Sequence, residues 1–145
     1  MSGQTENPGA LVFERLMPHP PEKIWRALTE SRLIEQWLMK NDFVAEVGRR
    51  FTVRAQPLEG WSGVTNCEVV EVEAPRRLVY RWGDGTESKS GVKTVVTWTL
   101  TPSGNGTIVR LVQSGFRPED RLAHTRMGGG WPHVLERLEQ SAGGA

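Results

Sequence analysis

The spacing of apolar residues changes several times along the chain and so predicts an order of elements. Residues 10–17 form an apolar run that ends at Pro18, which is typical of a strand. A helix is expected to start near Pro21, because proline lacks an N–H and is tolerated in the first turn. Apolar residues at helical spacing continue through this segment and recur from Ser31, which predicts a second short helix.

From residue 43 the apolar positions alternate, and the pattern is that of strands joined by short turns. Gly48 and the segment 103–106 have the composition of tight turns between neighbouring strands. The segment 83–91 has no apolar residue and is expected to be a loop. The predicted strands are 43–47, 50–54, 64–73, 78–82, 92–101 and 107–113.

The last periodic segment, residues 118–141, predicts a long helix with Leu122 and Trp131 on its apolar side. Gly128–Gly130 and the following Pro132 are expected to weaken or kink this helix. The order β, α, α, about six strands and α predicts an α+β fold. In this fold a curved antiparallel sheet of six or seven strands wraps a long C-terminal helix, with a ligand cavity between them.

The length of 145 residues suits one domain, which we place at residues 10–141 between a loose leader (1–9) and a loose tail (142–145). The net charge is +1 and no basic block is present, so no nucleic-acid partner is expected. Neither a signal pattern nor an apolar run near the roughly 18 residues of a membrane span occurs. A single cysteine, Cys67, excludes an internal disulfide. These features predict a cytoplasmic protein without membrane contact.

The sequence offers little for catalysis or metal binding. His19, His124, His133 and Cys67 fall in unlike elements, so no metal and no cofactor are expected. No serine stands in a Gly-x-Ser-x-Gly motif, and a cysteine in the middle of a strand is usually inert. No catalytic residue is therefore assigned.

Carboxylates remain as candidates for acid–base chemistry, because a carboxyl group facing an apolar cavity has a raised pKa. Glu71 and Glu73 alternate with valines and are expected to face solvent. For Glu14 and Glu68 the pattern leaves both possibilities open.

The aromatic residues are the best functional lead, since six tryptophans in so short a chain either fill a core or line a pocket. Tyrosine and tryptophan also need polar partners, which a ligand could supply. For any single ring, the sequence is consistent both with filling the core and with lining a pocket. The residues predicted to line the cavity are Phe51, Tyr80, Trp82, Trp98, Gln113, Met127 and Trp131.

These elements and residues resemble the AHSA1-like family (activator of Hsp90 ATPase homologue 1-like) of the SRPBCC, or START/Bet v 1-like, helix-grip superfamily. The matching segments are 20–29, 36–37, 47–51, 70–82, 95–102, 106–107 and 130–135, within a span from about Val12 to Leu138. The sequence departs from the family at Gln113, where members often have histidine, so no role of that histidine is carried over.

The resemblance implies a helix-grip fold with an internal cavity but does not fix an activity. The first expectation is non-enzymatic binding of a small hydrophobic or aromatic molecule, of which self-protection against a metabolite is a special case. The alternatives are an Hsp90-type chaperone or regulator interaction module, and a polyketide cyclase/aromatase-like enzyme using Tyr80, Gln113, Glu14 or Glu68. Pairing of exposed edge strands leaves both a monomer and a homodimer open.

Overall fold

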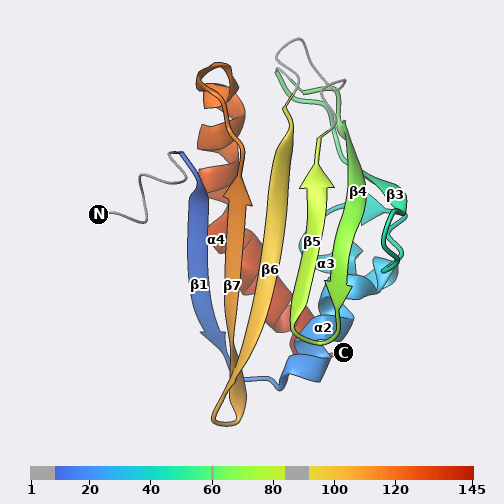
Figure 1. Cartoon of the computed structure of the whole chain (residues 1–145), viewed down its shortest axis with the longest axis vertical. Coiled ribbons are helices and arrows are strands. Elements are labelled where there is room, and N and C mark those ends of the chain that lie inside the picture. The colour runs from blue at the N-terminus through green and yellow to red at the C-terminus, as the bar shows by residue number, and fades with distance from the viewer. Residues whose placement is uncertain (1–8, 60, 84–91) are drawn as a thin grey trace.

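A computed structural model describes residues 9–59, 61–83 and 92–145 and contains one antiparallel sheet of seven strands. The strands lie in the order β1-β7-β6-β5-β4-β3-β2, so β1 and β2 form the two edges (Figure 1). Their bounds are β1 Leu11–Met17, β2 Lys40–Asn41, β3 Arg50–Arg54, β4 Val64–Glu73, β5 Arg77–Trp82, β6 Thr94–Ser103 and β7 Gly106–Ser114. The predicted loop at residues 83–91 lies, apart from Gly83, outside the described residues.

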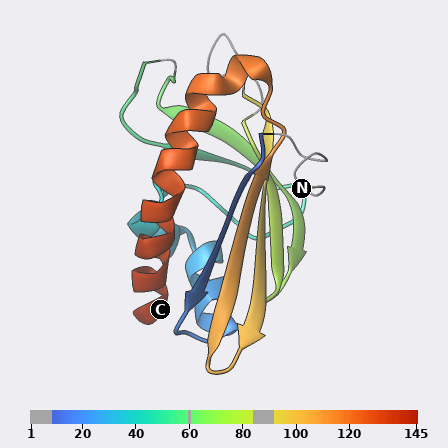
Figure 2. The same cartoon turned by 90° about the vertical axis from the view of Figure 1, so that its left-hand side faces the viewer.

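Three α-helices pack on one face of this sheet. The short helices α2 (Pro21–Thr29) and α3 (Ser31–Trp37) follow β1, and the long helix α4 (Arg121–Gly143) ends the chain after a 3-10 turn, η1 (Pro118–Asp120). Figure 2 shows α4 running along the concave side of the sheet, with α2 near its C-terminal end. The predicted helix-grip fold is confirmed. None of the helices in the described ranges is long and apolar enough to cross a membrane.

The central strands follow the predicted alternation closely. In β6, Thr94, Val96, Trp98 and Leu100 are all buried on the concave face. In β7 the buried Gln113 pairs with Val96 across the ladder, which places its amide among apolar neighbours. Strand pairing thus sets the buried polar side chain beside the rings, because side chains at opposed positions share one face.

The predicted strand at residues 43–47 is wrong. The strand here is the two-residue β2, and the chain from Asp42 to Arg49 is irregular. Asn41 Oδ1 accepts a hydrogen bond from the backbone N–H of Phe43 at 3.1 Å, and Asp42 Oδ1 accepts one from Thr52 N at 2.6 Å. These side-chain acceptors take donors that a strand ladder would use, a known competition of Asn and Asp with regular structure.

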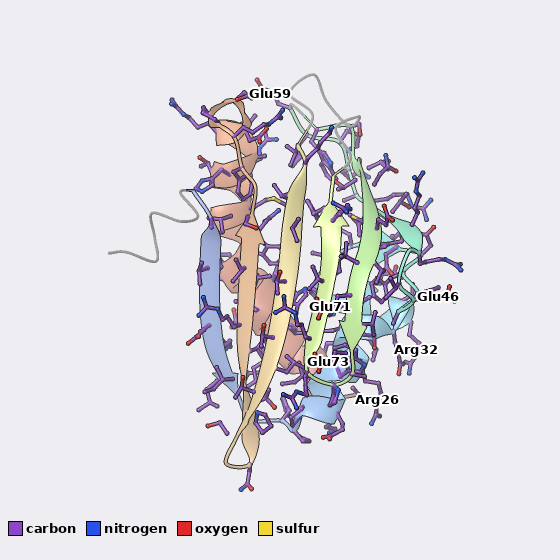
Figure 3. The ribbon with its side chains drawn as sticks, in the orientation of Figure 1. Arg26, Arg32, Glu46, Glu59, Glu71 and Glu73 are labelled. Carbon is purple, nitrogen blue, oxygen red and sulfur yellow. The ribbon has the colours of Figure 1, made fainter. Side chains whose placement is uncertain are left out.

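A β-bulge in β4 changes the predicted pattern there. The register with β5 shifts between Val69 and Glu71, so Val70 faces outward and is 39% exposed. Glu71 and Glu73 nevertheless lie on the surface as expected, and Figure 3 shows both at the outside of the sheet. Glu71 pairs with Arg77 at 3.1 Å. A bulge adds one residue to a strand, which lets two neighbouring side chains point to the same side.

Helix α4 runs as one α-helix through Gly128–Gly130 and Pro132 and extends to Gly143. Its two halves differ in burial. No residue from 121 to 130 is buried, whereas Trp131, Leu135 and Leu138 are. Leu122, predicted on the apolar side, is 49% exposed because it stands in the first turn, before the buried part of the helix. The glycine segment therefore separates a lightly packed half from a firmly packed half.

The start of α4 is held by an ion pair that makes stability depend on pH. The Arg117 guanidinium contacts Asp120 Oδ1 at 2.7 Å, and Asp120 is almost fully buried. Hydrogen bonds from Arg117 hold the pKa of the Asp120 carboxyl below its usual range. A carboxyl with a lowered pKa in the folded state stabilises the protein above its unfolded-state pKa, and this stabilisation is lost as pH falls through the folded-state pKa.

We therefore expect Asp120→Asn to lower the urea midpoint at pH 7, with a difference from wild type that shrinks as the pH falls below about 4. Urea titrations monitored by circular dichroism between pH 3 and pH 7 measure this. The matched control is Glu119→Gln, since Glu119 is exposed and 3.9 Å from Arg117. A constant difference at every pH would contradict the assignment.

Candidate functional site

The concave face of the sheet and the buried side of α4 bring the predicted cavity residues together. Phe51 comes from β3, Tyr80 and Trp82 from β5, Trp98 from β6, Gln113 from β7, and Met127 and Trp131 from α4. All but Met127 are buried, and Met127 is partly buried against the same core. Residues from four strands and one helix thus meet in one place.

The rings form a continuous series of contacts. Tyr80 packs edge-on against Phe51 with ring centroids 5.4 Å apart, and its centroid is 6.4 Å from that of Trp82. Trp131 connects the helix to the sheet, since its centroid lies 6.5 Å from Trp82 and 5.9 Å from Trp98. Edge-to-face pairs at these distances stabilise a core beyond area burial alone.

Two further rings belong to this series and were not predicted as site residues. Trp37 at the end of α3 lies edge-on to Trp98 at 5.6 Å, and Phe43 lies edge-on to Phe51 at 4.9 Å. The helical spacing of Trp37 shows that it is buried but not which ring it meets. Phe43 falls in the wrongly predicted strand. We call the seven residues Trp37, Phe43, Phe51, Tyr80, Trp82, Trp98 and Trp131 the ring cluster.

Gln113 is the polar centre beside the ring cluster. It is 0% exposed, and its Oε1 accepts a hydrogen bond from Trp131 Nε1 at 2.8 Å. Its Nε2 donates to Thr94 Oγ1 at 2.9 Å and approaches Met127 Sδ at 3.2 Å. Thr94 in turn donates to the carbonyl of Trp82 at 3.0 Å. The amide thereby joins β7, β6, β5 and α4 through a chain of internal hydrogen bonds, and it satisfies the indole of Trp131 without any ligand.

Tyr80 and Trp98 form a second polar pair. Trp98 Nε1 donates to the Tyr80 hydroxyl at 2.9 Å. Burial raises the pKa of Tyr80 far above its usual value, the hydrogen bond from Trp98 opposes this, and the nearby Cys67 adds to it. The phenol therefore stays protonated at any physiological pH and offers a proton rather than a charge.

Glu14 and Glu68, whose orientation the sequence pattern does not decide, lie away from the ring cluster. Glu14 is on the outer face of β1 and pairs with Arg110 at 3.2 Å. Glu68 alternates with the buried Cys67 and Val69 and so faces outward, where it lines a groove of about 480 Å³ with Arg50 and Arg81, its neighbours across the ladder. Among the described residues no group of three or more His, Cys, Asp or Glu could hold a metal ion.

Open space lies beside α4 at Gly130, the residue before Trp131 of the ring cluster. Arg126 Nη1 donates to the carbonyl of Glu59, labelled in Figure 3, and Arg137 Nε donates to the carbonyl of Trp37 at 3.4 Å. Gly130 lies between these contacts, one residue before Trp131, and is partly buried. A Cβ added there would meet nothing within 4 Å. We call this place, bounded by Arg126, Gly130 and Arg137, the flank opening.

A curved antiparallel sheet around a C-terminal helix, with a ring cluster between them, defines the class as helix-grip proteins. Within that class the chain belongs to the family described as "Activator of Hsp90 ATPase homolog 1-like protein", whose model matches residues 18–143. The predicted family is confirmed. No curated protein matches the chain at a significant level.

Two solved structures are similar in both sequence and fold. Protein MLL2253 from Mesorhizobium loti is 48% identical, with a TM-score of 0.83 over 91% of this chain and 95% of that one. BH1534 from Bacillus halodurans is 31% identical, with a TM-score of 0.74 over 92% and 96%. The Aha1 dimer from Colwellia psychrerythraea is 21% identical, with a TM-score of 0.75 over 92% and 95%, and shows the fold alone.

Proposed function

We propose that this protein binds a small apolar or aromatic molecule between its sheet and α4, without chemical turnover. The flank opening is the observation that carries the proposal. Three glycines in succession remove side chains from α4 where it passes the ring cluster, and at Gly130 the backbone is partly buried with free space beside it. At Gly129 and Gly130, where an added Cβ would meet nothing within 4 Å, a helix that served packing alone would gain stability from alanine or leucine. Gly128 differs, because an added Cβ there would lie 3.3 Å from Leu11 Cδ2.

The chemistry of the ring cluster suits an apolar ligand. The cluster contains the neutral phenol of Tyr80, and the buried thiol of Cys67 lies near that phenol. Arg137 contacts the backbone carbonyl of Trp37. Partly buried Leu38, Met127 and Val134 pack against the same core, and flexible thioethers adapt well to varied shapes. Binding sites for small molecules are predominantly apolar, with a few polar groups that fix orientation.

The enzyme alternative has less support. Glu14 and Glu68 face outward, and Tyr80 holds its proton too firmly to exchange it near neutral pH. Gln113 has no titratable proton and is occupied by internal hydrogen bonds. General acid–base catalysis needs a group whose pKa lies near the working pH.

The test is a fluorescence titration with 1-N-phenylnaphthylamine, a neutral aromatic probe, on wild type and two variants. Gly130→Leu places a side chain in the flank opening and is expected to raise Kd at least about tenfold, equal to about 1.4 kcal/mol. The matched control is Gly129→Leu, whose position is exposed. Both variants should melt at or above the wild-type temperature, because leucine favours the helix over glycine.

Absence of saturable binding to wild type, or equal Kd values for Gly130→Leu and wild type, would contradict the proposal. Native mass spectrometry of protein isolated from its own organism tests whether a natural ligand is bound. An added mass of small-molecule size supports binding, whereas a bound protein chain would favour the chaperone or regulator module.

A further inference from the structure

The hydroxyl of Tyr80 is a buried donor for which the described residues provide no acceptor. Its side chain lies in the ring cluster and the residue is 4% exposed. The oxygen accepts from Trp98 Nε1 at 2.9 Å, but within residues 9–59, 61–83 and 92–145 nothing accepts the hydroxyl proton. A buried donor without a partner is energetically unfavourable, and such groups are few in folded proteins.

The indole of Trp82 presents a second donor of the same kind. Trp82 is 3% exposed, yet the described part of the chain offers its Nε1 no acceptor. The other buried indoles are all satisfied: Trp37 donates to the carbonyl of Ala27, Trp98 to Tyr80 and Trp131 to Gln113. The exception is therefore confined to two residues that neighbour each other on the concave face of β5.

The position of these donors indicates a shared role. Tyr80 and Trp82 are two residues apart on one strand, so their side chains leave the same face, and their ring centroids are 6.4 Å apart with planes tilted by 35°. Trp82 also touches Trp131 of α4, the residue that follows Gly130 at the flank opening. Both rings thus belong to the cluster that the proposed ligand would contact.

We propose that the ligand is a neutral aromatic carbonyl compound whose oxygen accepts hydrogen bonds from the Tyr80 hydroxyl and the Trp82 indole. This assignment rests on the proposed function. A carbonyl oxygen has two lone pairs and can accept both donors at once. No side chain of the ring cluster is charged, so a charged group placed between Tyr80 and Trp82 would lose its hydration without a charged partner from the cluster, which is strongly unfavourable. Arg126 and Arg137 lie at the flank opening instead.

The Tyr80 hydroxyl and the Trp82 indole both offer hydrogen-bond donors, which disfavours ligands that themselves carry only donors. Burial keeps the phenol of Tyr80 protonated, and an indole N–H never accepts a hydrogen bond. The Tyr80 oxygen already accepts from Trp98. An aromatic ketone, lactone or quinone therefore fits better than an aromatic amine or an unsubstituted hydrocarbon.

The experiment compares fluorenone with fluorene, which have nearly the same shape and differ in the carbonyl group. Isothermal titration of wild type is expected to give a Kd for fluorenone at least about tenfold lower than for fluorene. Tyr80→Phe and Trp82→Phe should each reduce this ratio, because each removes one of the two donors that only fluorenone can use. Trp25→Phe, a partly exposed indole outside the ring cluster, is the matched control and should leave the ratio unchanged.

Infrared spectra of bound fluorenone give a second readout that does not depend on affinity. The carbonyl stretch should shift to lower frequency in wild type and return toward its apolar-solvent value in Tyr80→Phe. If both compounds bind with equal Kd and the carbonyl stretch is unshifted, this assignment is overturned while the proposed function stands. If neither compound nor 1-N-phenylnaphthylamine binds, the proposed function itself fails.

Discussion

Trp98→Ala is expected to lower the free energy of unfolding by about 3–5 kcal/mol, the range for removing a large aromatic from a core. Trp98 is 0% exposed and lies edge-on to both Trp37 and Trp131, so its loss opens a cavity between the sheet, α3 and α4. It also removes the donor that the Tyr80 hydroxyl accepts. Urea unfolding at equilibrium, followed by circular dichroism, measures the change.

The control for Trp98→Ala is Trp61→Ala. Trp61 is a partly exposed residue whose indole donates to Thr65 at 2.9 Å, outside the ring cluster. We expect a distinctly smaller loss there, because a partly exposed ring leaves no closed cavity. Equal losses for the two variants would show that Trp98 does not hold the layers together.

Gln113→Leu is expected to destabilise the protein by about 2–3 kcal/mol, since it leaves the buried indole of Trp131 without its acceptor. Leucine is similar in size to glutamine, so a lost hydrogen bond rather than a cavity dominates the effect. Urea unfolding is again the measurement. Gln140→Leu, at an exposed position of α4, should change stability by less than about 0.5 kcal/mol.

A double-mutant cycle separates the hydrogen bond from packing. Trp131→Phe removes the donor, so adding Gln113→Leu to it should cost less than Gln113→Leu costs alone. Additive effects would mean that the contact between Trp131 and Gln113, at 2.8 Å, contributes little. The Trp98 and Gln113 variants test different contributions to stability. Trp98 contributes ring packing in the core, whereas Gln113 provides the hydrogen-bond acceptor for the Trp131 indole.

The ring cluster serves stability and the proposed binding at once. Most of its polar groups are paired internally, as Trp131 with Gln113 and Trp98 with Tyr80 show. Two donors without an acceptor among the described residues, on Tyr80 and Trp82, and the flank opening are local exceptions in a core of buried, mutually contacting side chains. Proteins commonly accept small losses of stability where a site needs free space or free donors.

The sequence by itself determined the order of elements and the inward face of the central strands. Alternation identified Trp98 and Gln113 as inward residues, because side chains in a strand alternate between two faces whatever the tertiary structure. It failed at Phe43, where Asn41 and Asp42 bind backbone donors, and at Val70, where a bulge breaks the period. The Asp42–Thr52 contact and the bulge both depend on a neighbouring strand, about which the periodicity of one segment holds no information.

Only the tertiary structure decided which polar groups meet. Gln113, Thr94 and Trp131 lie on β7, β6 and α4, and their hydrogen bonds follow from strand register and the position of the helix. The same holds for the space beside Gly130 and for the donors of Tyr80 and Trp82, which find no acceptor within the described ranges of the chain. A residue type states what a side chain can donate or accept, but distances of about 3 Å between residues far apart in sequence are set by packing.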